Sequence, residues 1–174
     1  MRDISYIANN GVAYPGREVS LRVSNSNSSS VEIDRLYIEN YLQRPDERNQ
    51  FVFFFSTTPP FLSSGVVFTG KNYTVPYTQT FLKPPENYLT FPYSSNFTAV
   101  LPASAYIEFK VIFVPITNGT YSGKLKIRTT NGALFIINLA GSKGPEIEEV
   151  DNLFFGVEVE LLDGLGTLEI DNLG

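Results

Sequence analysis

The chain has 174 residues and a formal net charge of −5. It contains no cysteine and no histidine, which excludes disulfides, thiolate nucleophiles, imidazole bases and metal sites built from these residues. Because basic residues are not in excess, neither nucleic acid nor an anionic membrane surface is expected as a partner.

The composition predicts a folded, all-β protein. Hydrophobic residues make up 43% and charged residues 18%, as in globular domains, and 14 Phe and 10 Tyr favour strands. The length suits one domain with an appendage. The N-terminus lacks the continuous apolar segment of a signal peptide, and no apolar run is long enough to span a membrane.

The first half of the chain contains three predicted strands. Residues 18–24 alternate apolar and polar side chains and lead into a polar loop at 24–30. Residues 31–40 form a second strand, in which the alternation slips near Asp34 and Arg35 and predicts a bulge. Residues 51–55, FVFFF, are apolar throughout, which is typical of a strand covered on both faces.

Residues 61–100 are rich in Tyr, Phe and Pro. The prolines forbid long central strands, so this segment is predicted to contain one or two short edge strands or an extended loop. Its aromatic residues either pack the segment onto the rest of the domain or form a contact surface. The rings concerned are Tyr73, Tyr77, Phe81, Tyr88, Phe91, Tyr93 and Phe97, of which the first six are candidate partner-binding residues.

Residues 105–141 predict three consecutive antiparallel strands. Residues 105–115 alternate before becoming fully apolar, and Leu125 and Ile127 point inward between outward cations. Asn131 and Gly132 supply a hairpin turn of two residues. No amphipathic helical stripe occurs, and the whole chain indicates an immunoglobulin-like antiparallel sandwich of about seven to eight strands.

A series of residues in the second half of the chain follows the order and spacing of a known motif. These residues are Phe113, Pro115, Gly119, Tyr121, Gly123, Leu125, Ile127, Leu139, Gly141, Gly144 and Pro145. The series resembles the C-terminal half of the ASH or Hydin-type domain, also known as the choice-of-anchor D module. The resemblance covers roughly residues 5–147, with 61–100 as an insertion, and implies an immunoglobulin-like scaffold. We expect Gly141 and Gly144 to release the last strand into a linker.

The tail, residues 148–174, resembles the beginning of the same chain. Residues 168–172 (LEIDN) match residues 21–25 (LRVSN), which indicates an incomplete second repeat. Either the chain is a fragment of a tandem array with a frayed tail, or the tail docks on the first domain or on another subunit. Its many apolar side chains favour docking, and the candidate partner contacts are Phe154, Phe155, Val157 and Val159.

Acidic residues gather in the same tail, but without the spacing of a calcium-binding loop. We interpret them as a solvated linker and strand face, and we expect no metal, no cofactor and no catalysis by paired carboxylates. Other protein subunits are the expected partners, in a homo-oligomer or hetero-oligomer.

Three functions fit these observations. The first is a structural module of a large assembly such as a bacteriophage virion, as a head or tail decoration or connector protein. The second is a secreted or surface adhesion module from a tandem array that binds protein or glycan. The third is a flagellar or centrosomal scaffold fragment; the family resemblance alone implies only the scaffold.

Overall fold

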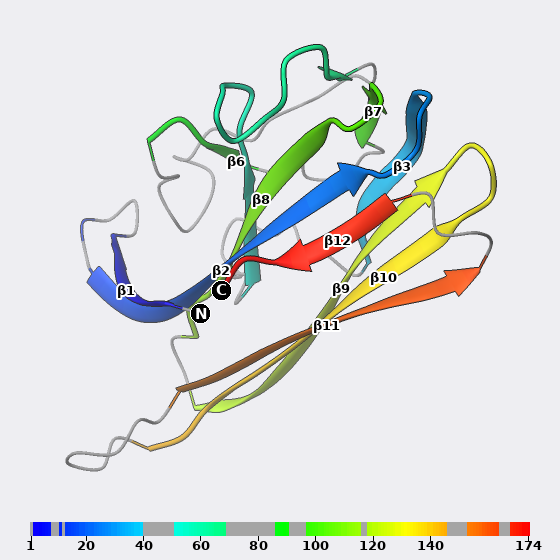
Figure 1. The fold of residues 1–174 in the computed structure, drawn as a ribbon. Coiled ribbons are helices and arrows are strands. Elements are labelled where there is room, and N and C mark those ends of the chain that lie inside the picture. Colours follow the sequence, from blue (N-terminus) through cyan, green and yellow to red (C-terminus); the bar gives the residue numbers. More distant parts are fainter. Residues whose placement is uncertain are drawn as a thin grey trace.

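Two antiparallel β-sheets face each other in the computed structural model of the chain (Figure 1). Among the residues that the structure describes, ten strands have five or more residues, and two further strands, β5 and β6, have two residues each. The structure describes residues 2–7, 11, 13–39, 51–68, 86–90, 97–115, 118–145, 153–163 and 168–174.

The first sheet is built around the longest strand, β2. One side of β2 pairs with β8, followed by β4 and β6, and its other side pairs with both β1 and β12. The strands of this sheet are β1 (Arg2–Ile7), β2 (Ala13–Asn25), β4 (Phe51–Phe55), β6 (Leu89–Thr90), β8 (Tyr106–Phe113) and β12 (Leu168–Asn172).

The second sheet has the order β11-β10-β9-β3-β7-β5. In this sheet β9 pairs with β10, as predicted, and β10 pairs with β11. The predicted run of three consecutive antiparallel strands is therefore only partly correct, because its first strand, β8, lies in the other sheet between β2 and β4. The strands of this sheet are β3 (Val31–Glu39), β5 (Val67–Phe68), β7 (Phe97–Leu101), β9 (Gly119–Thr129), β10 (Leu134–Lys143) and β11 (Leu153–Asp163).

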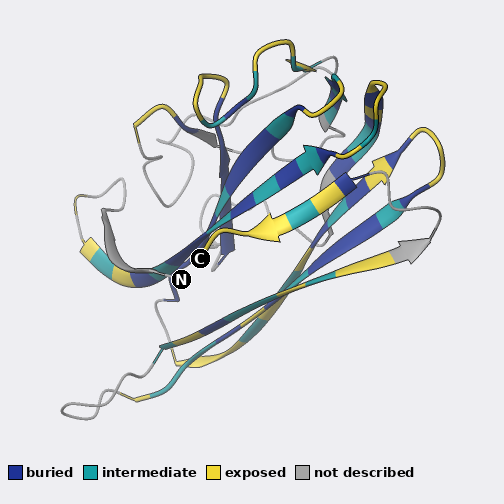
Figure 2. Cartoon of the chain, viewed as in Figure 1, coloured by how far each residue is buried: buried dark blue, intermediate teal, exposed yellow. Residues whose placement is uncertain are grey.

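The main core lies between the sheets and follows the alternation of the sequence. Val19, Leu21 and Val23 of β2 have no exposed surface, and neither do Leu125 and Ile127 of β9 (Figure 2). Burying each of these side chains stabilises the fold by roughly 1.5–3 kcal/mol before the entropy cost is counted. The predicted inward faces of both strands are therefore confirmed.

Two finer predictions about strands are also confirmed. The pairing register of β3 shifts between Ile33 and the residues that follow it, which is the bulge predicted near Asp34 and Arg35. All five residues of β4 are buried. Phe53 faces the main core, whereas Phe54 belongs to a second apolar cluster on the other face of the first sheet.

The predicted count of seven to eight strands is wrong, because strands form at both ends of the chain. β1 pairs with the beginning of β2, and neither segment was predicted to be a strand. β11 and β12 add one strand to each sheet. Their alternating apolar residues give each strand one face that the sandwich can bury, as the period-two pattern requires.

The Pro-rich segment contributes three strands among its described residues. β5 and β6 have two residues each and lie at sheet edges, as predicted. β7 departs from the prediction of one or two edge strands, because it is a third strand and lies between β3 and β5. Residues 69–85 and 91–96 lie outside the described part of the chain.

The tail strands complete the same two sheets. β11 runs along the whole of β10, from Lys143 opposite Leu153 to Leu134 opposite Asp163. β12 pairs with the segment of β2 that it resembles in sequence, with Ile170 opposite Val23. The boundary at residue 147 between a first domain and a second repeat stays a prediction, since strand pairing does not define where a repeat ends.

Candidate interaction site

The β11 strand is the outermost strand of the second sheet. Among the described residues it pairs only with β10, and Figure 1 shows it along the margin of that sheet. An edge strand of this kind presents backbone N–H and C=O groups that a further strand can pair with.

One end of β11 is anchored in the core by Phe155. Its side chain is 3% exposed, and its ring centroid lies 5.9 Å from that of Phe51 and 5.7 Å from that of Phe113. Val157 and Val159 continue the same face of the strand and are half-buried against the core. The strand is therefore held firmly enough to present its remaining surface in a fixed geometry.

Among the described side chains of β11, two large apolar ones are exposed. Phe154 is 56% exposed and Leu161 is 44% exposed. The Phe154 ring lies on the outer face of the sheet beside Gly156, where an added Cβ would be 3.1 Å from the ring. The glycine thus leaves space for an aromatic ring that the rest of the sandwich does not cover.

The four candidate contacts of the tail therefore differ in accessibility. Phe154 is open to a partner, Val157 and Val159 are partly open, and Phe155 is used by the core. Their role in partner binding stays a prediction. Leu161 extends the accessible apolar surface to the far end of the strand.

Of the six candidate partner-binding residues in the Pro-rich segment, Tyr88 is the one that lies among the described residues. It is 5% exposed, within the second apolar cluster, with its ring centroid 5.1 Å from that of Phe61. Its ring already packs the segment onto the first sheet. The other five candidates, Tyr73, Tyr77, Phe81, Phe91 and Tyr93, lie outside the described residues.

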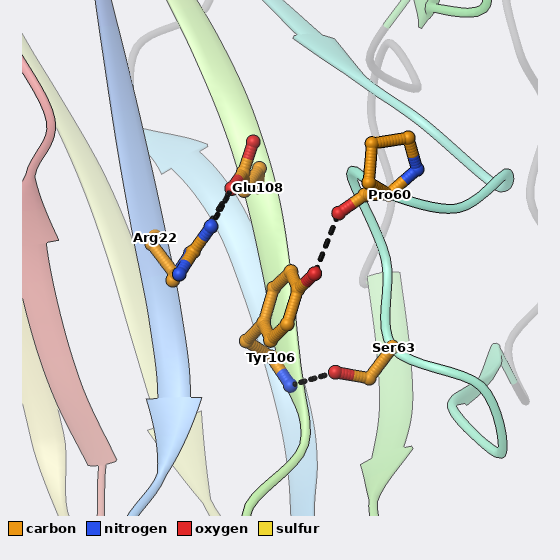
Figure 3. Close-up of polar contacts among 5 residues, drawn as sticks. All are labelled: Arg22, Pro60, Ser63, Tyr106 and Glu108. Carbon is orange, nitrogen blue, oxygen red and sulfur yellow. Dashed lines mark hydrogen bonds and ion pairs between the residues drawn. The ribbon is translucent and has the colours of Figure 1, made fainter.

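Charged side chains form two ion pairs beside this cluster. Arg22 of β2 donates to the Oε1 atom of Glu108 of β8 at 2.5 Å (Figure 3). Lys110 donates to the Oε1 atom of Glu18 at 2.9 Å. Both glutamates are buried, so each carboxylate needs its cation to offset the loss of hydration.

The electrostatic effects agree with this geometry. The hydrogen bond to Glu108 raises the pKa of Arg22. Burial, followed by the nearby charges of Glu108 and Glu18, raises the pKa of Tyr88 to about 12. The ion pair thus stabilises the charged form of Arg22, and burial stabilises the neutral form of Tyr88.

Two hydrogen bonds also connect the loop after β4 to Tyr106 of β8. The Tyr106 hydroxyl donates to the Pro60 carbonyl at 2.6 Å, and the Tyr106 amide donates to the Ser63 hydroxyl at 2.9 Å (Figure 3). The alternation in residues 105–115 indicates that Tyr106 and Glu108 share one face of their strand. It could not pair Glu108 with Arg22, because that needs the register between β2 and β8.

Neither a metal site nor a membrane span is found in the described part of the chain. No group of three or more acidic side chains there is arranged to hold a metal ion. No described helix has the length and apolar character required to cross a bilayer.

These features define the chain as a two-sheet antiparallel β-sandwich with an exposed apolar edge. In comparisons with protein-family models, curated proteins and solved structures, no match to the chain was found.

Proposed function

We propose that this protein is a non-enzymatic structural module that acts through contacts with other protein subunits of a large assembly. The observation that carries the proposal is the edge strand β11, which is anchored by Phe155 and leaves Phe154 and Leu161 exposed. Large apolar side chains beside an edge strand are a hazard for a solitary domain and are suited to a protein that is covered by a partner.

The strand order supports an immunoglobulin-like scaffold. The series β1-β2-β8-β4 and β10-β9-β3 correspond to the two sheets of that fold, ABED and GFC. One departure is β7, which lies beside β3 although it follows β4 in the chain. The resemblance to the ASH or Hydin-type domain belongs to the same proposal, since it rests on residues of β8, β9 and β10.

We further propose a virus particle as the assembly, with the protein as a head or tail decoration or connector. The supporting feature is the composition of the sequence, which contains no Cys, Trp or His. A particle component of this kind needs a scaffold and a surface for contacts, and the exposed edge at β11 is our candidate for that surface.

The test is to follow the protein through purification of particles from the cells that produce it. We expect it to sediment with nuclease-resistant particles and to be labelled on them by specific antibodies in electron microscopy. The double variant Phe154→Ser/Leu161→Ser should fold normally and be depleted from the particles. A protein that remains in the slowly sedimenting fraction, away from any particle, would contradict the proposal.

The second candidate function is a secreted or surface adhesion module. The observation that favours it is the internal repeat, since residues 168–172 match residues 21–25 and the two segments pair with each other. Detection of the protein on the cell surface, within a much longer polypeptide on an immunoblot, would favour adhesion over the particle.

A further inference from the structure

The free side of β11 combines an unpaired strand edge with a distinctive alternation of side chains. Phe154, Gly156, Glu158 and Glu160 lie on the outer face of the sheet, and Phe155, Val157, Val159 and Leu161 lie on the inner face. From Phe154 to Leu161 the strand has β10 on one side and no described strand on the other.

The inner face of β11 becomes more open along the strand. Phe155 is 3% exposed, Val157 and Val159 are half-buried, and Leu161 is 44% exposed. β11 therefore extends beyond the cover that the first sheet provides. A neighbouring strand with apolar residues on this face would complete that cover and remove further apolar surface from water.

The outer face of the same edge is acidic. Glu158 and Glu160 are both exposed, and Asn138 of β10 donates to the Oε1 atom of Glu160 at 3.1 Å. The cation in register with Glu158 lies two strands away from it. Lys124 of β9 is opposite Asn138 of β10, and Asn138 is in turn opposite Glu158 of β11. A strand added beside β11 would meet these glutamates directly.

The neighbouring edge of the first sheet has the same sign of charge. β12 follows β11 after residues 164–167 and exposes Glu169 and Asp171. Both edge strands of the tail thus expose carboxylates. Because the chain carries a net charge of −5, an approaching partner of opposite charge is also favoured at long range.

We propose that β11 binds an extended segment of a partner protein by strand addition, in which apolar residues alternate with Lys or Arg. The backbone of the added strand pairs with β11, its apolar side chains contact Val157, Val159 and Leu161, and its cations lie beside Glu158 and Glu160. This inference rests on the proposed function, because it names the chemistry of the partner at the same edge.

A second copy of this chain fits the edge less well. In antiparallel registers that are centred near Glu158 and keep the inner faces of both strands on the same side, Glu158 and Glu160 lie opposite or diagonal to the same residues of the other strand. Like charges in these positions destabilise a strand pair, whereas opposite charges stabilise it. The charge of the edge therefore selects a cationic strand.

The test uses capped synthetic peptides of about nine residues, the length of one strand. The probe alternates valine with lysine, and the first control alternates valine with glutamate. A second control carries the probe sequence with N-methyl groups on alternate amides, which removes the backbone donors needed for pairing. Binding to the full chain is measured by fluorescence anisotropy, and amide chemical shifts locate the contact.

We expect the lysine peptide to bind at least about tenfold more tightly than either control, and more weakly as salt rises. The perturbed amides should belong to β11 and β10. The double variant Glu158→Lys/Glu160→Lys should reverse the preference and favour the glutamate peptide. The matched variant Glu32→Lys/Glu86→Lys changes the charge equally at exposed sites away from β11 and should retain the original preference.

Several results would overturn the proposal. Equal binding of the lysine and glutamate peptides would show that charge does not select the strand, and equal binding of the N-methylated peptide would exclude backbone pairing. The proposal is also overturned if the peptide perturbs the amides of another strand edge, or if the chain forms a dimer that is lost on charge reversal of β11.

The particle experiment separates this inference from the proposed function. If the charge-reversed chain still enters particles normally, this inference fails while the proposed function stands. If the peptide results hold but no particle contains the protein, the proposed function fails instead.

Discussion

Gly141 of β10 lies directly beneath the aromatic ring of Phe113 of β8, so that the two sheets approach each other closely at this point. A Cβ atom at residue 141 would lie 2.6 Å from two atoms of that ring. Phe113 has no exposed surface and also contacts Phe51, Tyr121 and Phe155. The ring therefore has little room to move away from an added methyl group.

We expect Gly141→Ala to destabilise the protein by about 1–3 kcal/mol, the usual range for overpacking a core. Urea unfolding followed by circular dichroism measures the change in the free energy of unfolding. The control is Gly144→Ala, because nothing lies within 4 Å of a Cβ at that residue. If both variants unfold at the same urea concentration as the original chain, the packing of Phe113 on Gly141 is not tight.

Phe154 and Phe155 are neighbours in the chain and are predicted to respond oppositely to substitution. Phe155→Ala should lower the free energy of unfolding by about 3–5 kcal/mol, because it leaves a cavity between Phe51 and Phe113. Phe154→Ala should change it by no more than about 0.5 kcal/mol, since the ring is 56% exposed. Both variants are measured by thermal and urea unfolding. If Phe154→Ala destabilises the protein and Phe155→Ala does not, the faces of β11 are exchanged and the strand is in the opposite register.

Ionisation of Tyr88 should make the protein less stable in alkali. The pKa of Tyr88 is raised from its ordinary value of 10.0 to about 12, first by burial and then by Glu108 and Glu18. Between these two pH values the unfolded chain releases the Tyr88 proton and the folded chain retains it, so the free energy of unfolding falls as pH rises. Below that window the shift has no effect on stability.

The measurement compares urea unfolding of the original chain with that of Tyr88→Phe at several pH values. The difference in unfolding free energy should be constant below pH 10 and should move in favour of the variant from pH 10.0 towards 12. Ultraviolet difference absorbance of the same pair follows the ionisation itself. A difference that is independent of pH across this window would show that Tyr88 titrates as an ordinary tyrosine.

Local alternation in the sequence predicted much of the sandwich, because each strand buries one face. The inward residues of β2, β8 and β9 follow this pattern. β4 instead buries both faces, as its uninterrupted apolar sequence predicted. The hairpin between β9 and β10 differs in detail. The Thr129 amide donates to the Ala133 carbonyl, so the loop has three residues, with Gly132 at φ +92°.

The sequence could not predict features that depend on contacts between distant strands. Gly141 was expected to end a strand, yet it lies within β10 and makes room for Phe113. The ion pair between Arg22 and Glu108 likewise depends on a register that joins residues far apart in the chain. For the same reason the exposed edge at β11 could be located only after the order of the strands was known.

A chain shortened to residues 1–147 tests the predicted division into a sandwich and a second repeat. This truncation removes Phe155 and Leu168, which are 3% and 4% exposed, and uncovers the edges of β10 and β2. We expect a lower melting temperature and aggregation, because both newly exposed edges carry apolar faces. The measurements are circular dichroism on heating and light scattering at room temperature, with a chain lacking only Leu173 and Gly174 as the control. If residues 1–147 melt within a few degrees of the full chain and remain monomeric, the tail is a separate unit and the boundary at residue 147 is correct.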